Sequence, residues 1–254
     1  MPGHRFYLPK SQWNDKALTL GEEEAHHCIN VLRLQQGARA TVFDGSGNEA
    51  NCTIQSIDKK SVVLQVLQKL TTLRPPCAIT LGQAVPKGKN MELIVQKAVE
   101  LGASHIAPLI SERTVIDLDA KEAEKKQEKW QQTAIEACKQ CGQNWLPEVF
   151  TPQSLDSFFK QGKSWDLMLV ASLQPEAKPL KSVLAEFQEQ HGKRPASVCI
   201  LVGPEGDFTP AEISRAKSEG CHPITLGPIV LRTETAALYC LSVLSHELFS
   251  LESI

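Results

Sequence analysis

The sequence predicts an α/β protein in two parts, a small N-terminal β-structure and a larger C-terminal domain built on a parallel sheet. Three observations support this prediction. Short strand-like runs fill residues 5–67, strands and helices alternate further along the chain, and the proline pair Pro75-Pro76 separates the two patterns. Because consecutive prolines stiffen a segment in an extended form, we place the boundary here, with one domain over residues 1–73 and the other over 74–254.

The N-terminal part consists of short β-rich runs. Branched and aromatic residues recur in four of them, which predicts strands over residues 5–9, 38–44, 48–57 and 61–67. The run DGSGN between the second and third strands has the residues of a tight turn. A helix is expected over residues 23–33, since its apolar residues recur at helical spacing. This combination is typical of a small β-barrel or sandwich.

The C-terminal part alternates apolar runs with amphipathic ones. Continuous apolar runs predict buried strands over residues 78–85, 105–110, 165–171 and 197–202. Apolar residues at helical spacing predict helices over residues 91–101, 121–141 and 179–190. Strands that are apolar throughout, with helices between them, indicate a parallel sheet covered on both faces.

A glycine-proline loop follows the strand over residues 197–202. The tight turn GPEG occupies residues 203–206, and the run TPAE follows at 209–212. Threonine at the N-cap, proline at the first helical position and glutamate at the third make a capping box, so a helix is expected to begin here.

A second glycine-proline loop follows the strand HPITL at residues 222–226, and the chain then runs through VLRTETAAL into a final helix. Ligands of open α/β sheets bind at the carboxyl ends of strands, where loops expose backbone groups. The two loops are therefore candidates for a ligand site; the alternative is that their glycines only make the connections, as a single glycine-proline turn more often does. The sequence holds neither a G-x-G-x-x-G run nor a Walker phosphate loop, so a dinucleotide or Walker-type site is not supported.

The charge balance does not by itself favour nucleic acid as a partner. The 27 Lys and Arg residues against 29 Asp and Glu give a formal net charge of −2, whereas phosphate-binding proteins usually carry a basic surplus. Any RNA-binding surface must therefore be a local patch.

The chain shows no sign of export or membrane insertion. No apolar run reaches the roughly 18 residues that a membrane helix needs, and the N-terminal run MPGHRFYLPK lacks the apolar core of a signal peptide. The 8 cysteines are scattered, mostly among apolar neighbours, as reduced thiols in a core are. We expect a cytoplasmic protein.

Cys138 and Cys141 form a C-x-x-C pair, which raises the alternative of a metal or redox site. The sequence has no second pair at zinc spacing, and helical spacing places both thiols on one apolar face with Trp130 and Ala134. Packing in the core is the favoured interpretation, and no metal is expected.

The run LVGPEGDFTPAEI, followed by LGPIVLRTETAAL, resembles the ribosomal RNA small subunit methyltransferase E family of knotted SPOUT methyltransferases. The resemblance continues in RFYLP, HHCINVLRLQQG, PKGKNMELIVQKAVELG, SERTVI and EACKQCGQNWLPEV, and it covers nearly the whole chain in the expected order. A single GPEG run would be a weak signal, but the ordered set is specific.

This resemblance implies a PUA-like RNA-binding barrel in the N-terminal part and a SPOUT domain with a deep trefoil knot in the C-terminal part. It also implies a homodimer, S-adenosylmethionine as methyl donor, and N3 of a uridine in 16S rRNA of the small ribosomal subunit as acceptor. The cofactor contacts would then map to Leu173, Gly203, Pro204, Glu205, Gly206, Leu226, Gly227, Leu231, Arg232, Thr235 and Ala236.

Three positions depart from the family's pattern. Asp207 stands where the family usually has a second glycine, and Ile229 and Gln143 stand where an arginine is common. The added carboxylate and the missing arginines weaken the expected basic patch, whereas the LRTETA run is intact.

Two residues are candidates for catalysis. Uridine N3 must lose its proton to become a good nucleophile, and a fixed guanidinium would stabilise the charge that spreads onto the ring oxygens. Arg232, the permanent cation in the LRTETA run, is the candidate for this role; the alternative is a structural arginine paired with Glu234 or Glu205. Glu205 has three open interpretations, as a base, as a ligand of the cofactor ribose, or as a structural turn carboxylate.

Four cations are candidate RNA contacts. Arg5 and Arg33 lie in the family-like runs RFYLP and VLR, and Lys87 and Arg113 would extend the same patch. Exposed lysines ordinarily only increase solubility, so the patch is a hypothesis to be tested.

Two other classes of protein remain open at this point. Asp207 and Ile229 would suit a catalytically degenerate RNA-binding factor of ribosome assembly, which should have lost cofactor binding. An α/β enzyme with a nucleotide cofactor and a small-molecule substrate would suit the near-neutral charge, but it leaves the N-terminal β-structure unexplained. Within the methyltransferase interpretation, a different RNA or a different uridine atom also stays open.

Overall fold

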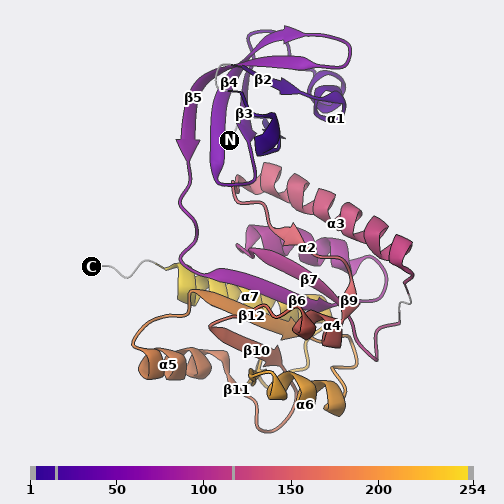
Figure 1. Cartoon of the computed structure of the whole chain (residues 1–254), viewed down its shortest axis with the longest axis vertical. Helices are drawn as coiled ribbons and strands as arrows, with labels where there is room; N and C mark the ends of the chain where they lie inside the picture. Colours follow the sequence, from indigo (N-terminus) through magenta and orange to yellow (C-terminus); the bar gives the residue numbers. More distant parts are fainter. Residues whose placement is uncertain (1–3, 15–16, 116–117, 251–254) are drawn as a thin grey trace. The chain divides into compact units, whose positions relative to one another are not determined.

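The computed structural model describes residues 4–14, 17–115 and 118–250 (Figure 1). The chain forms two compact units: the first comprises Met1–Arg74 with Ile135–Leu146, and the second comprises Pro75–Ala134 with Pro147–Ile254. The first unit therefore includes a segment from much further along the chain. The expected division into domains over residues 1–73 and 74–254 stays a prediction.

The first unit is built on a five-stranded sheet with the order β1-β3-β4-β5-β2. The pairing of β1 with β3 is parallel, and the other neighbours are antiparallel. The strands are β1 (Arg5–Tyr7), β2 (Ala17–Leu20), β3 (Arg39–Phe43), β4 (Asn48–Ile57) and β5 (Val62–Thr71). The four predicted strands are present. The four-residue β2 was not predicted, because so short a run carries little periodicity.

The core of the first unit lies on one face of this sheet. Alternate residues of the strands point to that face, including Phe6, Leu18, Leu20 and Leu64, each fully buried. A short helix, α1 (Glu22–His26), covers part of it and continues into the π-helical turn η2 (His27–Val31). The predicted single helix over residues 23–33 is therefore wrong in detail. The 3-10 turn η1 (Lys10–Gln12) was not predicted.

A buried polar network holds the segment 135–146 to the sheet of the first unit. Nη1 of Arg5 lies 3.0 Å from Oε2 of Glu49, and Nη2 donates to Oδ1 of Asn144 at 2.6 Å. The amide of Asn144 donates to Glu49 at 2.9 Å and to the Thr72 hydroxyl at 2.8 Å. Because the Arg5 side chain is only 7% exposed, its guanidinium serves this network rather than a surface.

The second unit is built on an eight-stranded sheet in which every pairing is parallel (Figure 1). Its strand order is β11-β13-β10-β12-β6-β7-β8, with β9 also paired to β7. The strands are β6 (Ala78–Ala84), β7 (His105–Ile110), β8 (Glu148–Val149), β9 (Gln153–Ser154), β10 (Leu167–Ala171), β11 (Lys178–Pro179), β12 (Ser197–Val202) and β13 (Cys221–Thr225). The predicted α/β class with a parallel sheet is confirmed.

Helices cover both faces of this sheet. The final helix α7 packs on β6, β12 and α2, while α4 and α6 contribute to a core cluster that includes Phe158, Leu201 and Ile213. The helices are α2 (Asn90–Glu100), α3 (Ala120–Cys141), α4 (Leu155–Lys160), α5 (Leu180–His191), α6 (Pro210–Ser218) and α7 (Thr233–Phe249). The short elements α4, β8, β9 and β11 were not predicted. The trefoil knot stays a prediction.

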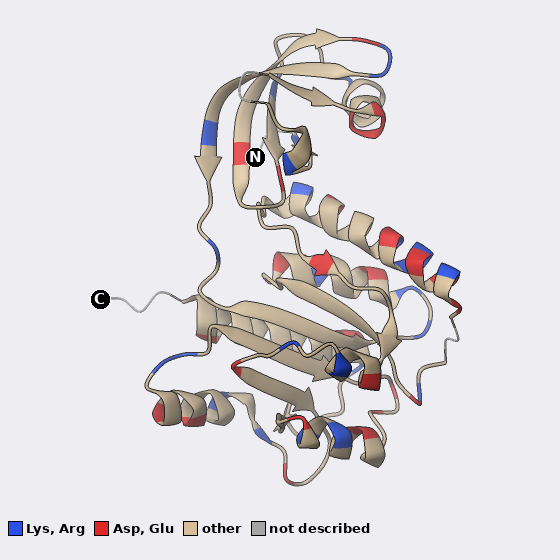
Figure 2. Cartoon of the chain, viewed as in Figure 1, with Lys and Arg blue, Asp and Glu red and all other residues tan. Residues whose placement is uncertain are grey.

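The capping box predicted at residues 209–212 forms as expected. Thr209 accepts from the backbone N–H of Glu212 at 3.3 Å, and Glu212 accepts from that of Thr209 at 2.8 Å, which completes the capping box of α6. Gly102 follows α2 with a φ of 82°. Figure 2 shows charges of both signs along α3, in accordance with a solvated helix face.

The described ranges contain neither a candidate membrane span nor a candidate metal cluster. No helix there is long and apolar enough to cross a membrane. The same residues contain no group of three or more His, Cys, Asp or Glu side chains placed to hold a metal ion.

We predict that Gly47→Ala destabilises the first unit. A Cβ atom at Gly47 would lie 2.4 Å from Cζ2 of Trp145, and the residue has a φ of 91°. The overlap should lower the free energy of unfolding by about 2 kcal/mol beyond the cost of the backbone conformation. Urea denaturation would measure the change.

The matched control is Gly37→Ala, because Gly37 has a similar φ of 87° but no atom within 4 Å of the added methyl group. It should cost only about 1 kcal/mol. Equal losses in the two variants would contradict the proposed contact with Trp145.

Candidate functional site

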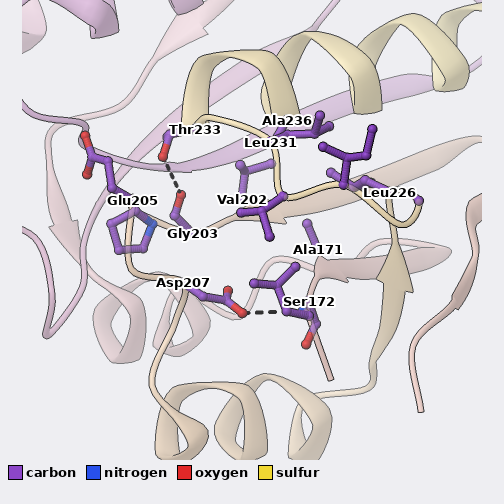
Figure 3. Close-up of a pocket in the computed structure, with 15 residues that line it drawn as sticks. Ala171, Ser172, Val202, Gly203, Glu205, Asp207, Leu226, Leu231, Thr233 and Ala236 are labelled. Carbon is purple, nitrogen blue, oxygen red and sulfur yellow. Dashed lines mark hydrogen bonds between the residues drawn. The ribbon is translucent and has the colours of Figure 1, made fainter. Parts of the chain in front are cut away.

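A pocket lies where the carboxyl ends of three neighbouring strands meet. The strands β13, β10 and β12 are adjacent in the sheet, and the segments that follow them line the pocket together with the start of α7 (Figure 3). The lining residues are Ala171, Ser172, Leu173, Val202, Gly203, Pro204, Glu205, Asp207, Leu226, Gly227, Ile229, Val230, Leu231, Thr233 and Ala236.

The loop after β12 doubles back on itself immediately after the strand. A Cβ atom at Gly203 would lie 3.0 Å from the backbone nitrogen of Phe208, so a side chain there would push the loop apart. The N–H of Asp207 donates to the Pro204 carbonyl at 2.9 Å, which closes the turn. Glu205 stands exposed on its outer side, where Oε1 accepts from the N–H of Lys87 at 3.0 Å.

Asp207 takes a backbone conformation that favours glycine, with a φ of 60°. Its carboxylate compensates through local hydrogen bonds. Oδ1 accepts from the N–H of Phe208 at 2.8 Å, and Oδ2 accepts from the N–H of Leu173 at 3.4 Å, the contact drawn as a dashed line in Figure 3. The second bond links the loop after β12 to the loop after β10.

The loops after β12 and β10 form two sides of the pocket. Residues 226–231 and the first turn of α7 form the third side. Gly227 has a φ of 112°, and Ile229 and Val230 are 73% and 71% exposed. Arg232 is the N-cap residue, and its carbonyl accepts from the N–H of Ala236 at 2.8 Å. The buried Thr233 hydroxyl points at the Gly203 carbonyl at 3.5 Å, so the helix start lies against the loop after β12 (Figure 3).

The chemistry of the lining is apolar inside and polar at its edges. Small and aliphatic side chains, such as Ala171, Val202 and Leu231, form the walls. Ionisable groups come from Glu205 and Asp207, and no Lys, Arg or His is found among the described residues that line the pocket. An apolar slot edged by backbone groups suits a flat heterocycle, and the carboxylates suit hydroxyl groups or positive charge.

The structure brings most of the predicted cofactor residues together. Eight of them line the pocket: Leu173, Gly203, Pro204, Glu205, Leu226, Gly227, Leu231 and Ala236. The other three, Gly206, Arg232 and Thr235, are exposed beside it and do not line it.

Sequence reasoning missed several lining residues. Ala171, Ser172, Val202, Val230 and Thr233 were not predicted, and Asp207 and Ile229 were noted only as departures from a pattern. Their signal was present in part, because Ala171 and Val202 are the last residues of their strands. Extending each predicted loop site into the last residue of the preceding strand would have found Ala171 and Val202.

The four predicted RNA contacts have different environments. In the second unit, the guanidinium of Arg113 donates to the Gly206 carbonyl, and Lys87 is exposed beside Glu205. In the first unit, Arg33 is exposed with a φ of 53°, two residues after the end of the π-helical turn. Arg5 is buried in its ion pair, so the expectation that it contacts RNA does not fit the structure.

The two thiols of the C-x-x-C pair differ in environment. Cys138 is buried, and burial raises the pKa of its thiol to about 12. Cys141 is exposed, so the expectation that both lie on the apolar face is wrong for Cys141. A thiol protonated to so high a pH is a poor nucleophile and a poor metal ligand, and Cys138 is a core residue.

Comparisons with known proteins agree with this architecture. A family model described as an RNA methyltransferase domain matches residues 73–245, and one described as an RNA methyltransferase PUA domain matches residues 20–67. The chain is 34% identical over 230 residues to ribosomal RNA small subunit methyltransferase E of Bacillus subtilis, with 89% of this chain and 88% of that protein covered.

Two solved structures resemble the whole chain. Ribosomal RNA small subunit methyltransferase E from Neisseria gonorrhoeae, bound to S-adenosylmethionine, is 30% identical with a TM-score of 0.84, covering 97% of this chain and 98% of that chain. A protein from Legionella pneumophila, solved with the bound cofactor S-adenosylmethionine, is 35% identical with a TM-score of 0.87 and the same coverage, 97% and 98%.

The fold and the pocket thus define a class of protein, in which an RNA methyltransferase domain on a parallel sheet follows a PUA domain. The family within that class follows from the extent of the match, which spans most of both chains. The chain belongs to the ribosomal RNA small subunit methyltransferase E family.

Proposed function

We propose that this protein transfers a methyl group from S-adenosylmethionine to N3 of a uridine in 16S rRNA of the small ribosomal subunit, in the cytoplasm and as a homodimer. The observation that carries the proposal is the pocket. Three strand-end loops and the start of α7 form it, and the exposed Arg232 lies beside it. Family membership supports the choice of ribosomal RNA.

The residues present fit S-adenosylmethionine, which supplies an electrophilic methyl group when bound. The apolar walls suit an adenine ring, and the glycine at 203 lets backbone groups approach a ligand closely. Asp207 keeps the turn that a glycine would make, because its φ of 60° is accommodated by its own hydrogen bonds. The preserved turn argues against the alternative that the protein is a catalytically degenerate RNA-binding factor.

The surroundings of Arg232 support the proposal that it acts on the acceptor nucleotide. Its neighbours Leu231 and Thr233 line the pocket, whereas its own side chain is exposed. Among the described residues no ion pair joins Arg232 to Glu234 or Glu205, and the Glu205 carboxylate binds the N–H of Lys87 instead, so contacts do not support the structural alternative. The positive end of the helix dipole repels a cation at the helix N-terminus, so this position does not favour the stability of the helix. The guanidinium and the helix dipole would together stabilise the negative charge of a deprotonated uracil.

Glu205 keeps more than one interpretation. Its Oε1 holds the N–H of Lys87 at 3.0 Å, which gives it a structural role in joining the loops after β6 and β12. Glu205 is also one of the lining residues and is exposed, so its carboxylate stays a candidate for contact with ligand hydroxyl groups or for proton removal.

A local basic patch beside the pocket supports RNA as the substrate. Lys87 and Arg113 follow β6 and β7, and both contact the loop over residues 203–207. Cations at the carboxyl edge of the sheet can bind phosphates next to a nucleotide that enters the pocket. In the first unit, the exposed Arg33 offers a further phosphate contact.

Exposed apolar side chains support the homodimer. Leu93 of α2 is 41% exposed and Tyr239 of α7 is 46% exposed, and the two helices pack against each other. Ile229 and Val230 add an exposed apolar pair beside the pocket. A second copy of the chain could cover such surface, as an isologous interface does.

The first experiment measures methyl transfer from radiolabelled S-adenosylmethionine to small ribosomal subunits from cells that lack the modification, followed by mass mapping of the rRNA. A label on N3 of a single uridine is expected. Cofactor binding without a label would redirect the proposal to another RNA. Absence of both would favour the degenerate RNA-binding factor.

We predict that Arg232→Ala loses turnover but keeps cofactor binding. Removal of a group that stabilises developing charge typically lowers kcat by about 10²–10³-fold. The Kd for S-adenosylmethionine should stay within about twofold, because the Arg232 side chain does not line the pocket. Calorimetry and the methylation assay would measure the two quantities, and unchanged turnover would refute the role.

We predict that Arg33→Glu weakens RNA binding without changing cofactor binding. Loss of one phosphate contact should also reduce the salt dependence of RNA affinity by roughly one ion. The matched control is Lys59→Glu, which makes the same change in charge at another exposed position of the first unit. Equal weakening by both variants would show that net charge, rather than Arg33, is responsible.

A further inference from the structure

We propose that Asp207 makes the pocket prefer a positively charged sulfonium ligand over its neutral thioether counterpart, so that S-adenosylmethionine binds in preference to S-adenosylhomocysteine. The inference rests on the proposed function, because it assigns a role within the proposed cofactor pocket. The feature that carries it is a carboxylate that is fixed inside a lining without cationic side chains.

The carboxylate of Asp207 is held at the pocket from both of its oxygens. Oδ1 is bound by the N–H of Phe208 at 2.8 Å, and Oδ2 by the N–H of Leu173 at 3.4 Å (Figure 3). The left-handed backbone, with a φ of 60°, fixes the direction in which the side chain leaves the chain. A charge held in this way costs little reorganisation when a ligand enters.

The other charges near Asp207 lie outside the pocket. The guanidinium of Arg113 approaches the same loop from its carbonyl side, at Gly206 and at 3.5 Å from the Asp207 carbonyl, and it is not among the lining residues. The carboxylate of Glu205 lies on the outer side of the same loop, where it accepts from the N–H of Lys87 at 3.0 Å. The described lining therefore favours positive charge, while Arg113 reduces the effect without reversing its sign.

The two ligands differ by one methyl group and one unit of charge at sulfur. Their adenosine and amino-acid parts are the same, so contacts with those parts affect both affinities alike. At an effective dielectric constant between that of a protein surface and water, a carboxylate in the lining would change the affinity ratio by about three- to tenfold. The consequence is easier exchange of product for fresh methyl donor.

The test is calorimetric measurement of Kd for both ligands with the full-length protein, without RNA. The variants are Asp207→Asn and Asp207→Gly, since asparagine and glycine both tolerate the left-handed backbone. In each, the ratio of Kd for S-adenosylhomocysteine to Kd for S-adenosylmethionine should fall about three- to tenfold. Glu189→Gln removes the same charge from an exposed position of α5 and should leave the ratio unchanged.

A purely structural role for Asp207 gives a different result. Loss of its hydrogen bonds alone would weaken both ligands equally and leave the ratio constant, which would overturn the inference. Rising ionic strength should shrink the ratio in the parent protein and have little effect on it in Asp207→Asn, because screening acts on the charge. If the parent protein binds neither ligand, the proposed function fails; if it binds both with a ratio that Asp207→Asn leaves unchanged, only this inference fails.

Discussion

Backbone hydrogen bonds pair β10 with β12 on one side and with β13 on the other, and all three strands run in the same direction. Their carboxyl ends therefore meet at one edge of the sheet, although the strands are separated in sequence by the helices α5 and α6. The loops that follow these three strands therefore face one another. The buried Thr233 at the start of α7, close to the Gly203 carbonyl, closes the remaining side of the pocket. The pocket is thus a consequence of strand order.

In the loop after β12, Asp207 stands where the family usually has a glycine, and the loop keeps the geometry that a glycine would give it. A reversal directly after a strand requires a left-handed residue, and glycine supplies this conformation without steric cost. Asp207 adopts it at the cost of some strain, which its hydrogen bond to Phe208 offsets. The same carboxylate then gives the lining a negative charge that a glycine would not. At position 207, aspartate therefore keeps the backbone conformation of a glycine but changes the charge of the pocket.

The first unit holds one of its arginines, Arg5, inside an ion-pair network rather than at the surface. The buried Arg5 guanidinium is stabilised through its two terminal nitrogens, which contact Glu49 at 3.0 Å and Asn144 at 2.6 Å, while its Nε has no hydrogen-bond partner in the described part of the chain. Removing one partner of such a group leaves an uncompensated charge, so the network fixes the segment 135–146 on the sheet. The exposed Arg33, two residues after the π-helical turn, makes no such internal contact among the described residues.

The sequence by itself determined the order of most helices and strands, the parallel sheet, the capping box at Thr209 and the two loops that carry the pocket, because these depend on local periodicity and turn chemistry. It also supplied the resemblance on which the family rests. Only the tertiary structure decided that Arg232 lies beside the pocket rather than in its lining, that Thr233 closes it, and that Arg5 is buried. Those outcomes depend on contacts between distant residues, such as Arg5 with Asn144 at a separation of 139 positions, which no local pattern encodes.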